Sequence, residues 1–144
     1  MRIPMGLTVC MLFAVGVFSA ALADLYHFEG YGSCVYNGVT YQGQWSGTLN
    51  TNSSGNNNGA CDFYGNWEAG GVGGTLRAVA FYNPQTGLYE VQYTPGIATY
   101  LGEDRATWEG YFDPEGTGNA GGVWSANPPD PYHGTWTGHL VTGP

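Results

Sequence analysis

The sequence is poor in charge and contains no lysine. Lysine and arginine together number 3, against 11 aspartates and glutamates, and the formal net charge is −8 at pH 7. Charged residues make up 10% of the chain, where about 25% is ordinary. Nucleic acids and anionic membrane surfaces, which select basic proteins, are therefore not expected partners. The missing lysines also exclude Schiff-base chemistry.

Residues 1–23 have the pattern of a secretory signal peptide. Arg2 supplies a positive charge, the following residues are nearly all apolar, and the segment ends in small residues. We predict cleavage between Ala23 and Asp24, which would leave a single secreted or periplasmic domain of residues 24–144. The alternative is an uncleaved membrane anchor, but no basic stop-transfer cluster follows the apolar run, so no membrane contact is expected after cleavage.

Cysteine is scarce, with three in the whole chain. Cys10 falls in the predicted leader, which leaves Cys34 and Cys61. An even pair in an exported protein predicts a disulfide bond. On the loop-entropy model, such a bond would stabilise the fold by roughly 3 to 4 kcal/mol.

Helical periodicity is also missing beyond the leader, and strand periodicity takes its place. Residues 39–49 carry apolar residues or glycine at odd positions and polar residues at even positions, the alternation of a strand with one buried face. Trp45 has a glycine two residues away on each side, which leaves room for the indole to lie flat. The other four tryptophans repeat this spacing with glycine or alanine: Trp67, Trp108, Trp124 and Trp136.

The repeated Gly-x-Trp spacing predicts one core built from one kind of strand. Turn signals include Asn37-Gly38 as a hairpin or a bend, a polar loop at 50–59, a turn at 95–96 and a proline-rich turn at 127–133. We predict an all-β fold, a small antiparallel meander of 8–10 strands closed as a barrel, because closure removes exposed strand edges. A two-sheet β-sandwich is the alternative.

The Gly-x-Trp pattern around Gly43 and Trp45 is similar to the strand entry of lipocalins and avidins. That resemblance implies an antiparallel barrel that holds a ligand. The pattern occurs five times here, without other landmarks of those families. We therefore interpret it as a packing requirement common to antiparallel barrels and assign no family.

Metal and catalytic chemistry find little support in the sequence. The sequence contains three histidines, His27, His133 and His139. His133 and His139 lie on one expected strand about 20 Å apart, too far for one ion, so we predict neither a metal site nor a cofactor. Paired carboxylates of a glycosidase must lie within about 5 to 10 Å. The candidates are Glu68, Glu90 and Glu109. Nothing in the sequence brings them together, so a small secreted hydrolase is a secondary alternative.

The tryptophans admit two interpretations. They fill a core, which is the favoured one, or they line a cavity in which indoles stack on sugar rings or flat apolar ligands. The predicted function is a non-enzymatic module that binds a neutral ring-containing ligand, with carbohydrate preferred over a small apolar ligand. The predicted ligand-binding residues are Tyr132, His133, Trp136, Tyr64 and Tyr111. An alternative is a self-associating structural subunit that donates residues 24–32 as a strand.

Overall fold

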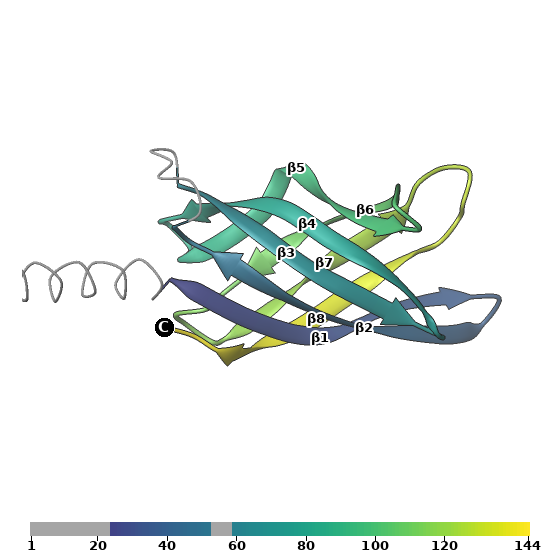
Figure 1. The fold of residues 1–144 in the computed structure, drawn as a ribbon, viewed down its shortest axis with the longest axis horizontal. Coiled ribbons are helices and arrows are strands. Elements are labelled where there is room, and N and C mark those ends of the chain that lie inside the picture. Colours follow the sequence, from purple (N-terminus) through teal and green to yellow (C-terminus); the bar gives the residue numbers. More distant parts are fainter. Residues whose placement is uncertain (1–23, 53–58) are drawn as a thin grey trace, which may run out of the picture.

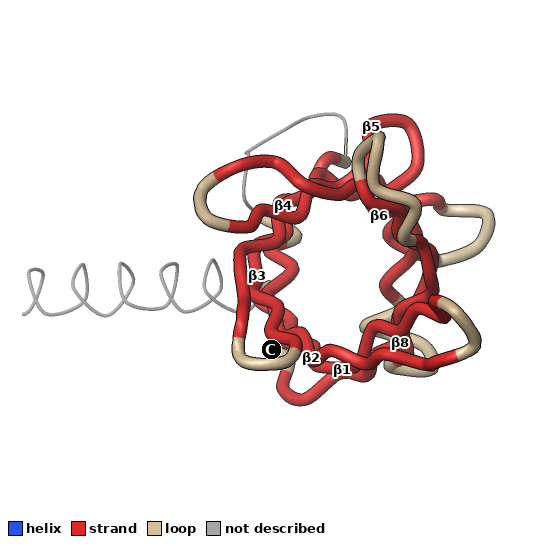
Figure 2. The backbone as a smooth tube through the Cα atoms, turned by 90° about the vertical axis from the view of Figure 1, so that its right-hand side faces the viewer, coloured by secondary structure: helices blue, strands red, loops and turns tan. Residues whose placement is uncertain are grey.

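The computed structural model describes residues 24–52 and 59–144, and the predicted signal peptide lies outside them. The elements are β1 (Leu25–Tyr36), β2 (Val39–Asn50), β3 (Ala60–Ala69), β4 (Val72–Asn83), β5 (Leu88–Tyr100), β6 (Glu103–Phe112), β7 (Asn119–Ala126) and β8 (His133–Thr142). Each strand pairs antiparallel with its sequence neighbours, and β8 pairs with β1 to close a barrel (Figures 1 and 2). The predicted all-β antiparallel barrel is confirmed, and a β-sandwich is not formed. Over the described residues, no helix is long and apolar enough to cross a membrane.

The two ends of the barrel carry different connections between strands (Figure 1). One end, called here the closed end, carries Asp24, Thr142 and the β2–β3, β4–β5 and β6–β7 connections. The other, called the open end, carries the β1–β2, β3–β4 and β5–β6 turns and the β7–β8 loop. Asn37 and Gly38 form the β1–β2 hairpin with φ of 50° and 76°, the positive values that a tight two-residue turn requires.

The closed end holds a packed aromatic and aliphatic core. The largest fully buried side chains are Phe28, Phe63, Phe112, Leu49 and Val91. The rings of Phe63 and Phe112 stack with their centroids 4.8 Å apart, and Phe28 meets Phe112 edge-on at 5.1 Å. Tyr26 closes this end by donating a hydrogen bond from its hydroxyl to Glu115 Oε1 at 2.8 Å. The core therefore occupies one half of the barrel.

Strand β5 departs from the sequence prediction. The expected turn at 95–96 is wrong, because β5 runs without a break from Leu88 to Tyr100. Its ladder to β6 instead shifts register between Val91 and Gly96. Pro95 lies in the bulged stretch, where it has no ladder partner and its missing N–H costs no strand hydrogen bond.

The predicted disulfide is also wrong for this fold, in which Cys34 and Cys61 are both free. Cys34 lies on β1 near the open end, whereas Cys61 begins β3 at the closed end. The ladder aligns Asp62, the neighbour of Cys61, with Asn50 and then with Leu25. Leu25 is about 30 Å of strand away from Cys34, and a disulfide needs Cα atoms within about 7 Å.

Candidate ligand-binding cavity

The open half of the barrel contains a cavity of about 620 Å³. All five tryptophans line it. They come from β2, β3, β6, β7 and β8, so indoles surround the space on several sides. The same side chains therefore cover the core and face a cavity.

Three tryptophans form the floor of the cavity. Trp45, Trp108 and Trp136 are 7–8% exposed. Trp136 meets both of the others edge-to-face, with ring centroids 5.5 Å apart in each case. Edge-to-face contact sets the positive edge of one ring against the negative face of the next, which adds to the burial energy. The stacked Phe63 and Phe112 contact this trio and separate the cavity from the closed end.

The side walls carry the two half-buried tryptophans. Trp67 is paired across strands with Trp45, and Trp124 is paired with Trp108. Trp67 also lies near Tyr100, with centroids 6.2 Å apart. Between these indoles the wall is smooth, because three paired small residues lie side by side on β5, β6 and β7: Ala98, Ala106 and Ala126. A flat ring fits such a surface better than a branched chain does.

Four of the indoles are held by one recurring contact. Each crosses a directly paired glycine on the next strand and donates its Nε1–H to a carbonyl on the strand beyond. The pairs are Trp45 with Thr137 O at 3.0 Å, Trp67 with Thr99 O at 2.9 Å, Trp124 with Ser33 O at 3.2 Å, and Trp136 with Glu109 O at 3.0 Å.

The crossed glycines explain why the indoles lie so close to the wall. They are Gly30, Gly74, Gly134 and Gly122. A Cβ atom at any of them would overlap the same carbonyl oxygen that accepts the indole hydrogen bond. Glycine is therefore required on the neighbouring strand, and the result is a set of indoles fixed flat against the barrel.

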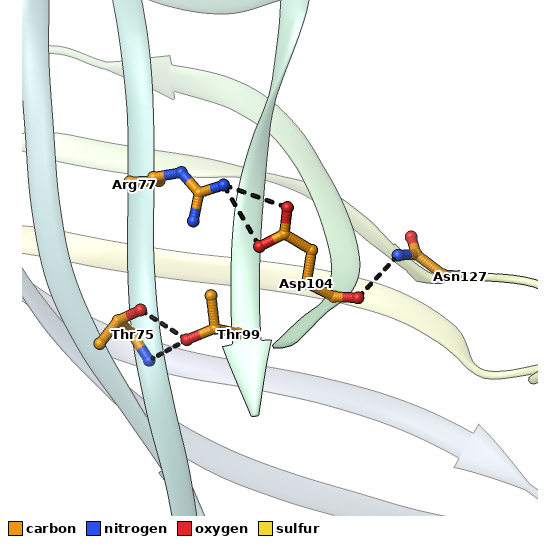
Figure 3. A network of polar contacts seen from close by, with 5 residues as sticks. All are labelled: Thr75, Arg77, Thr99, Asp104 and Asn127. Carbon is orange, nitrogen blue, oxygen red and sulfur yellow. Dashed lines mark hydrogen bonds and ion pairs between the residues drawn. The ribbon is translucent and has the colours of Figure 1, made fainter. Parts of the chain in front are cut away.

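The rim of the cavity is polar. Among its lining residues are Gln42, Gln44, Glu68, Arg105 and Asp130. The Arg105 guanidinium lies 2.8 Å from Glu103 Oε2, so its charge is largely balanced. Beside this edge a network of polar contacts ties β4, β5, β6 and the β7–β8 loop together (Figure 3). It includes the ion pair of Arg77 with Asp104 at 3.1 Å.

The structure brings two of the five predicted ligand-binding residues to the cavity. Trp136 lies in the floor and Tyr132 at the rim, where Tyr132 contacts Tyr36 edge-on at 5.1 Å. His133 is exposed, and its Nδ1 lies 3.3 Å from the carbonyl oxygen of Pro131. Tyr64 and Tyr111 alternate with inward-facing residues of β3 and β6, so they lie on the outer wall.

Several lining residues were not predicted. Tyr41 and Tyr100 reach the rim, and the free Cys34 faces the cavity from β1. Only the register of strand pairing places these residues together, since they come from three different strands. The Gly-x-Trp spacing was the one sequence signal for the site, and it identified the tryptophans without separating core from cavity.

The strongest pKa shifts lie at the closed end. Burial, together with the hydrogen bond to Glu115, raises the pKa of Tyr26 to about 12. Burial also raises the pKa of Tyr89 to about 12 and that of Cys61 to about 11. These groups stay neutral at physiological pH, which is consistent with their packing role.

No protein-family model matches the sequence, and a search of curated proteins gives no match either. The cavity and its lining residues therefore carry the functional argument.

Proposed function

We propose that this protein is a non-enzymatic binding module that holds a small, neutral, ring-containing ligand inside its barrel. The observation that carries the proposal is the cavity of about 620 Å³ lined by all five tryptophans. Ligand sites in proteins are mostly apolar, pre-formed cavities of about 300–1,000 Å³. Because four of the five indoles are hydrogen-bonded to the backbone, binding requires little ordering of side chains, which lowers its entropic cost.

The chemistry of the wall favours a flat ligand with few hydroxyl groups. Four indole N–H groups already donate to backbone carbonyls. A sugar bound inside the cavity would therefore leave most of its hydroxyl groups without hydrogen-bond partners. Each hydroxyl buried in this way costs binding free energy. An aromatic or alicyclic ring instead stacks on the indoles and loses little on leaving water.

A carbohydrate is the second candidate, and the composition of the rim supports it. Tyr41, Tyr100 and Tyr132 line the open end together with Asp130. Aromatic faces beside a carboxylate suit a sugar that sits at the mouth with its hydroxyls toward water.

The other two functions have less support. Donation of residues 24–32 as a strand requires a free edge, but β1 pairs with β2 on one side and with β8 on the other. The hydrolase alternative needs converging carboxylates. Glu90 and Glu109 alternate with the inward residues Val91 and Trp108, so both lie on the outer wall. Secretion remains a proposal that rests on the predicted leader.

Blocking the cavity tests the function. Ala106→Phe places a ring into the smooth wall, and Val123→Phe places the same ring on the outer face of β7, where Val123 is 47% exposed. Tryptophan fluorescence is followed during titration with indane, naphthalene and a glycan panel. We expect saturable binding of the apolar rings, at least tenfold weaker in Ala106→Phe and unchanged in Val123→Phe.

Two results would contradict the proposal. One is an emission spectrum that no ring compound or glycan changes at millimolar concentration. The other is equal loss of binding in Ala106→Phe and Val123→Phe, which would place the ligand elsewhere. If glycans bind and the apolar rings do not, the carbohydrate candidate is the correct one.

A further inference from the structure

One tryptophan breaks the recurring contact of the other four. Trp108 Nε1 is buried and has no hydrogen-bond partner among the described residues. Its ring nevertheless lies on its paired glycine, since the three atoms nearest to a Cβ at Gly96 all belong to Trp108. Indole nitrogen is a donor only, so an acceptor is missing.

The missing acceptor coincides with a gap between strands. For Trp45, Trp124 and Trp136, the accepting carbonyl belongs to the residue just before the one aligned with the crossed glycine. By the same rule, Trp108 should donate to the carbonyl of Arg77. The β4–β5 ladder, however, stops at Arg77 with Ile97 and resumes only at Phe81 with Glu90. We call this interval of 78–80 and 91–96 the seam.

The seam adjoins the cavity and is held firmly on its open-end side. Leu76 and Ala98, the pair that precedes Arg77 and Ile97 on the open-end side of the gap, both line the cavity. Figure 3 shows the bracing contacts, in which Thr75 Oγ1 lies 2.5 Å from Thr99 Oγ1 and Arg77 reaches Asp104 across β5. The gap is therefore a local feature of an otherwise closed wall.

We propose that Trp108 Nε1–H is the polar recognition point of the cavity and donates a hydrogen bond to an acceptor on the ligand. This inference rests on the proposed function and narrows it. The ligand is a neutral ring that carries one acceptor, such as a ketone or a ring ether, at its deep end. A buried donor without a partner is costly, so a ligand that satisfies it gains over an isosteric hydrocarbon.

Binding requires a small local movement. Neighbouring atoms cover Trp108 Nε1, so an acceptor reaches it when the indole tilts or the seam moves outward. Residues 92–95 pair with neither β4 nor β6, which permits that movement, whereas continuous ladders run beside Trp45, Trp124 and Trp136. Trp108 Nε1 therefore lies beside the seam, the part of the barrel wall that can move.

An isosteric ligand pair tests the proposal. Indane and 1-indanone have nearly the same shape and differ by one carbonyl acceptor. Their dissociation constants are measured on the wild type, Trp108→Phe and the control Trp124→Phe, whose indole N–H already donates to Ser33. The ratio of the indane to the 1-indanone constant should fall about tenfold in Trp108→Phe and stay unchanged in Trp124→Phe, because a neutral hydrogen bond is worth about that factor.

A second measurement covers the case in which Trp108→Phe does not fold. In ¹H–¹⁵N spectra of the wild-type protein, 1-indanone should move the Trp108 indole resonance downfield, and indane should not. Equal ratios in all three proteins, or the same shift with both ligands, would overturn the inference and leave the cavity as a binding site. If neither compound binds the wild type, the proposed function and this inference both fail.

Discussion

Replacing Gly122 by alanine should destabilise the barrel by about 3 kcal/mol. A Cβ at this position would overlap the carbonyl oxygen of Glu109 and lie 2.7 Å from the Cα of Gly110. These are backbone atoms of a closed ladder and cannot move aside, so the cost lies near the upper end of the 1–3 kcal/mol typical of overpacking. Losing the hydrogen bond from Trp136 to Glu109 adds about 1 kcal/mol. Alanine also lowers the conformational entropy of the unfolded chain, which offsets about 0.4–1 kcal/mol of this cost.

The matched control is Gly32→Ala on β1. Gly32 also lines the cavity, but the nearest atom to its added Cβ would be Thr135 O at 3.8 Å, an ordinary contact. Alanine should therefore be neutral there or stabilising by about 0.5 kcal/mol. Urea unfolding followed by tryptophan fluorescence gives both free energies. If Gly122→Ala is as stable as Gly32→Ala, the close crossing of indole, glycine and carbonyl does not exist as described.

Two further predictions concern the ionisable groups. Protein comprising residues 24–144, unfolded without a reducing agent, should react with two equivalents of a thiol reagent, because Cys34 and Cys61 are free. A value near zero would mean that the two cysteines are joined by a disulfide and that the strand register is wrong. Because the pKa values of Tyr26 and Tyr89 are raised to about 12 in the folded protein, their protonated forms stabilise the fold fully below pH ~10, the ordinary tyrosine pKa, and this stabilisation is lost as the pH rises toward 12. Tyr26→Phe should reduce the loss of unfolding free energy between pH ~10 and 12. An unchanged dependence on pH would contradict the burial of Tyr26.

Much of the barrel could be predicted because strand alternation is a local signal. The spacing around Trp45 was enough to predict inward tryptophans and glycine-rich strands. The reason for the glycines was only partly accessible, since the glycine that matters most lies on the paired strand: Trp45 needs Gly30, fifteen residues away. Such pairs follow from register, which a single strand does not reveal.

The same limit applies to the predicted site residues and to the predicted disulfide. Tyr64 and Tyr111 were chosen for exposure, but outward parity separates them from a cavity that lies inside the barrel. The disulfide followed from composition and export alone, whereas bond formation depends on the distance between two strands. Tyr132 and Trp136 both line the cavity, because the β7–β8 loop leads directly into β8.

The most direct test of the central claim is which aromatic resonances respond to a bound ring compound. In NMR spectra of the protein titrated with 1-indanone, the five indole N–H signals report on the cavity, and the rings of Tyr64 and Tyr111 report on the outer wall. We predict saturable shifts of the indole signals, strongest for Trp108, with the two tyrosine rings unchanged. Shifts confined to the outer tyrosines, or no saturable shift of any indole, would contradict a ligand-binding barrel interior.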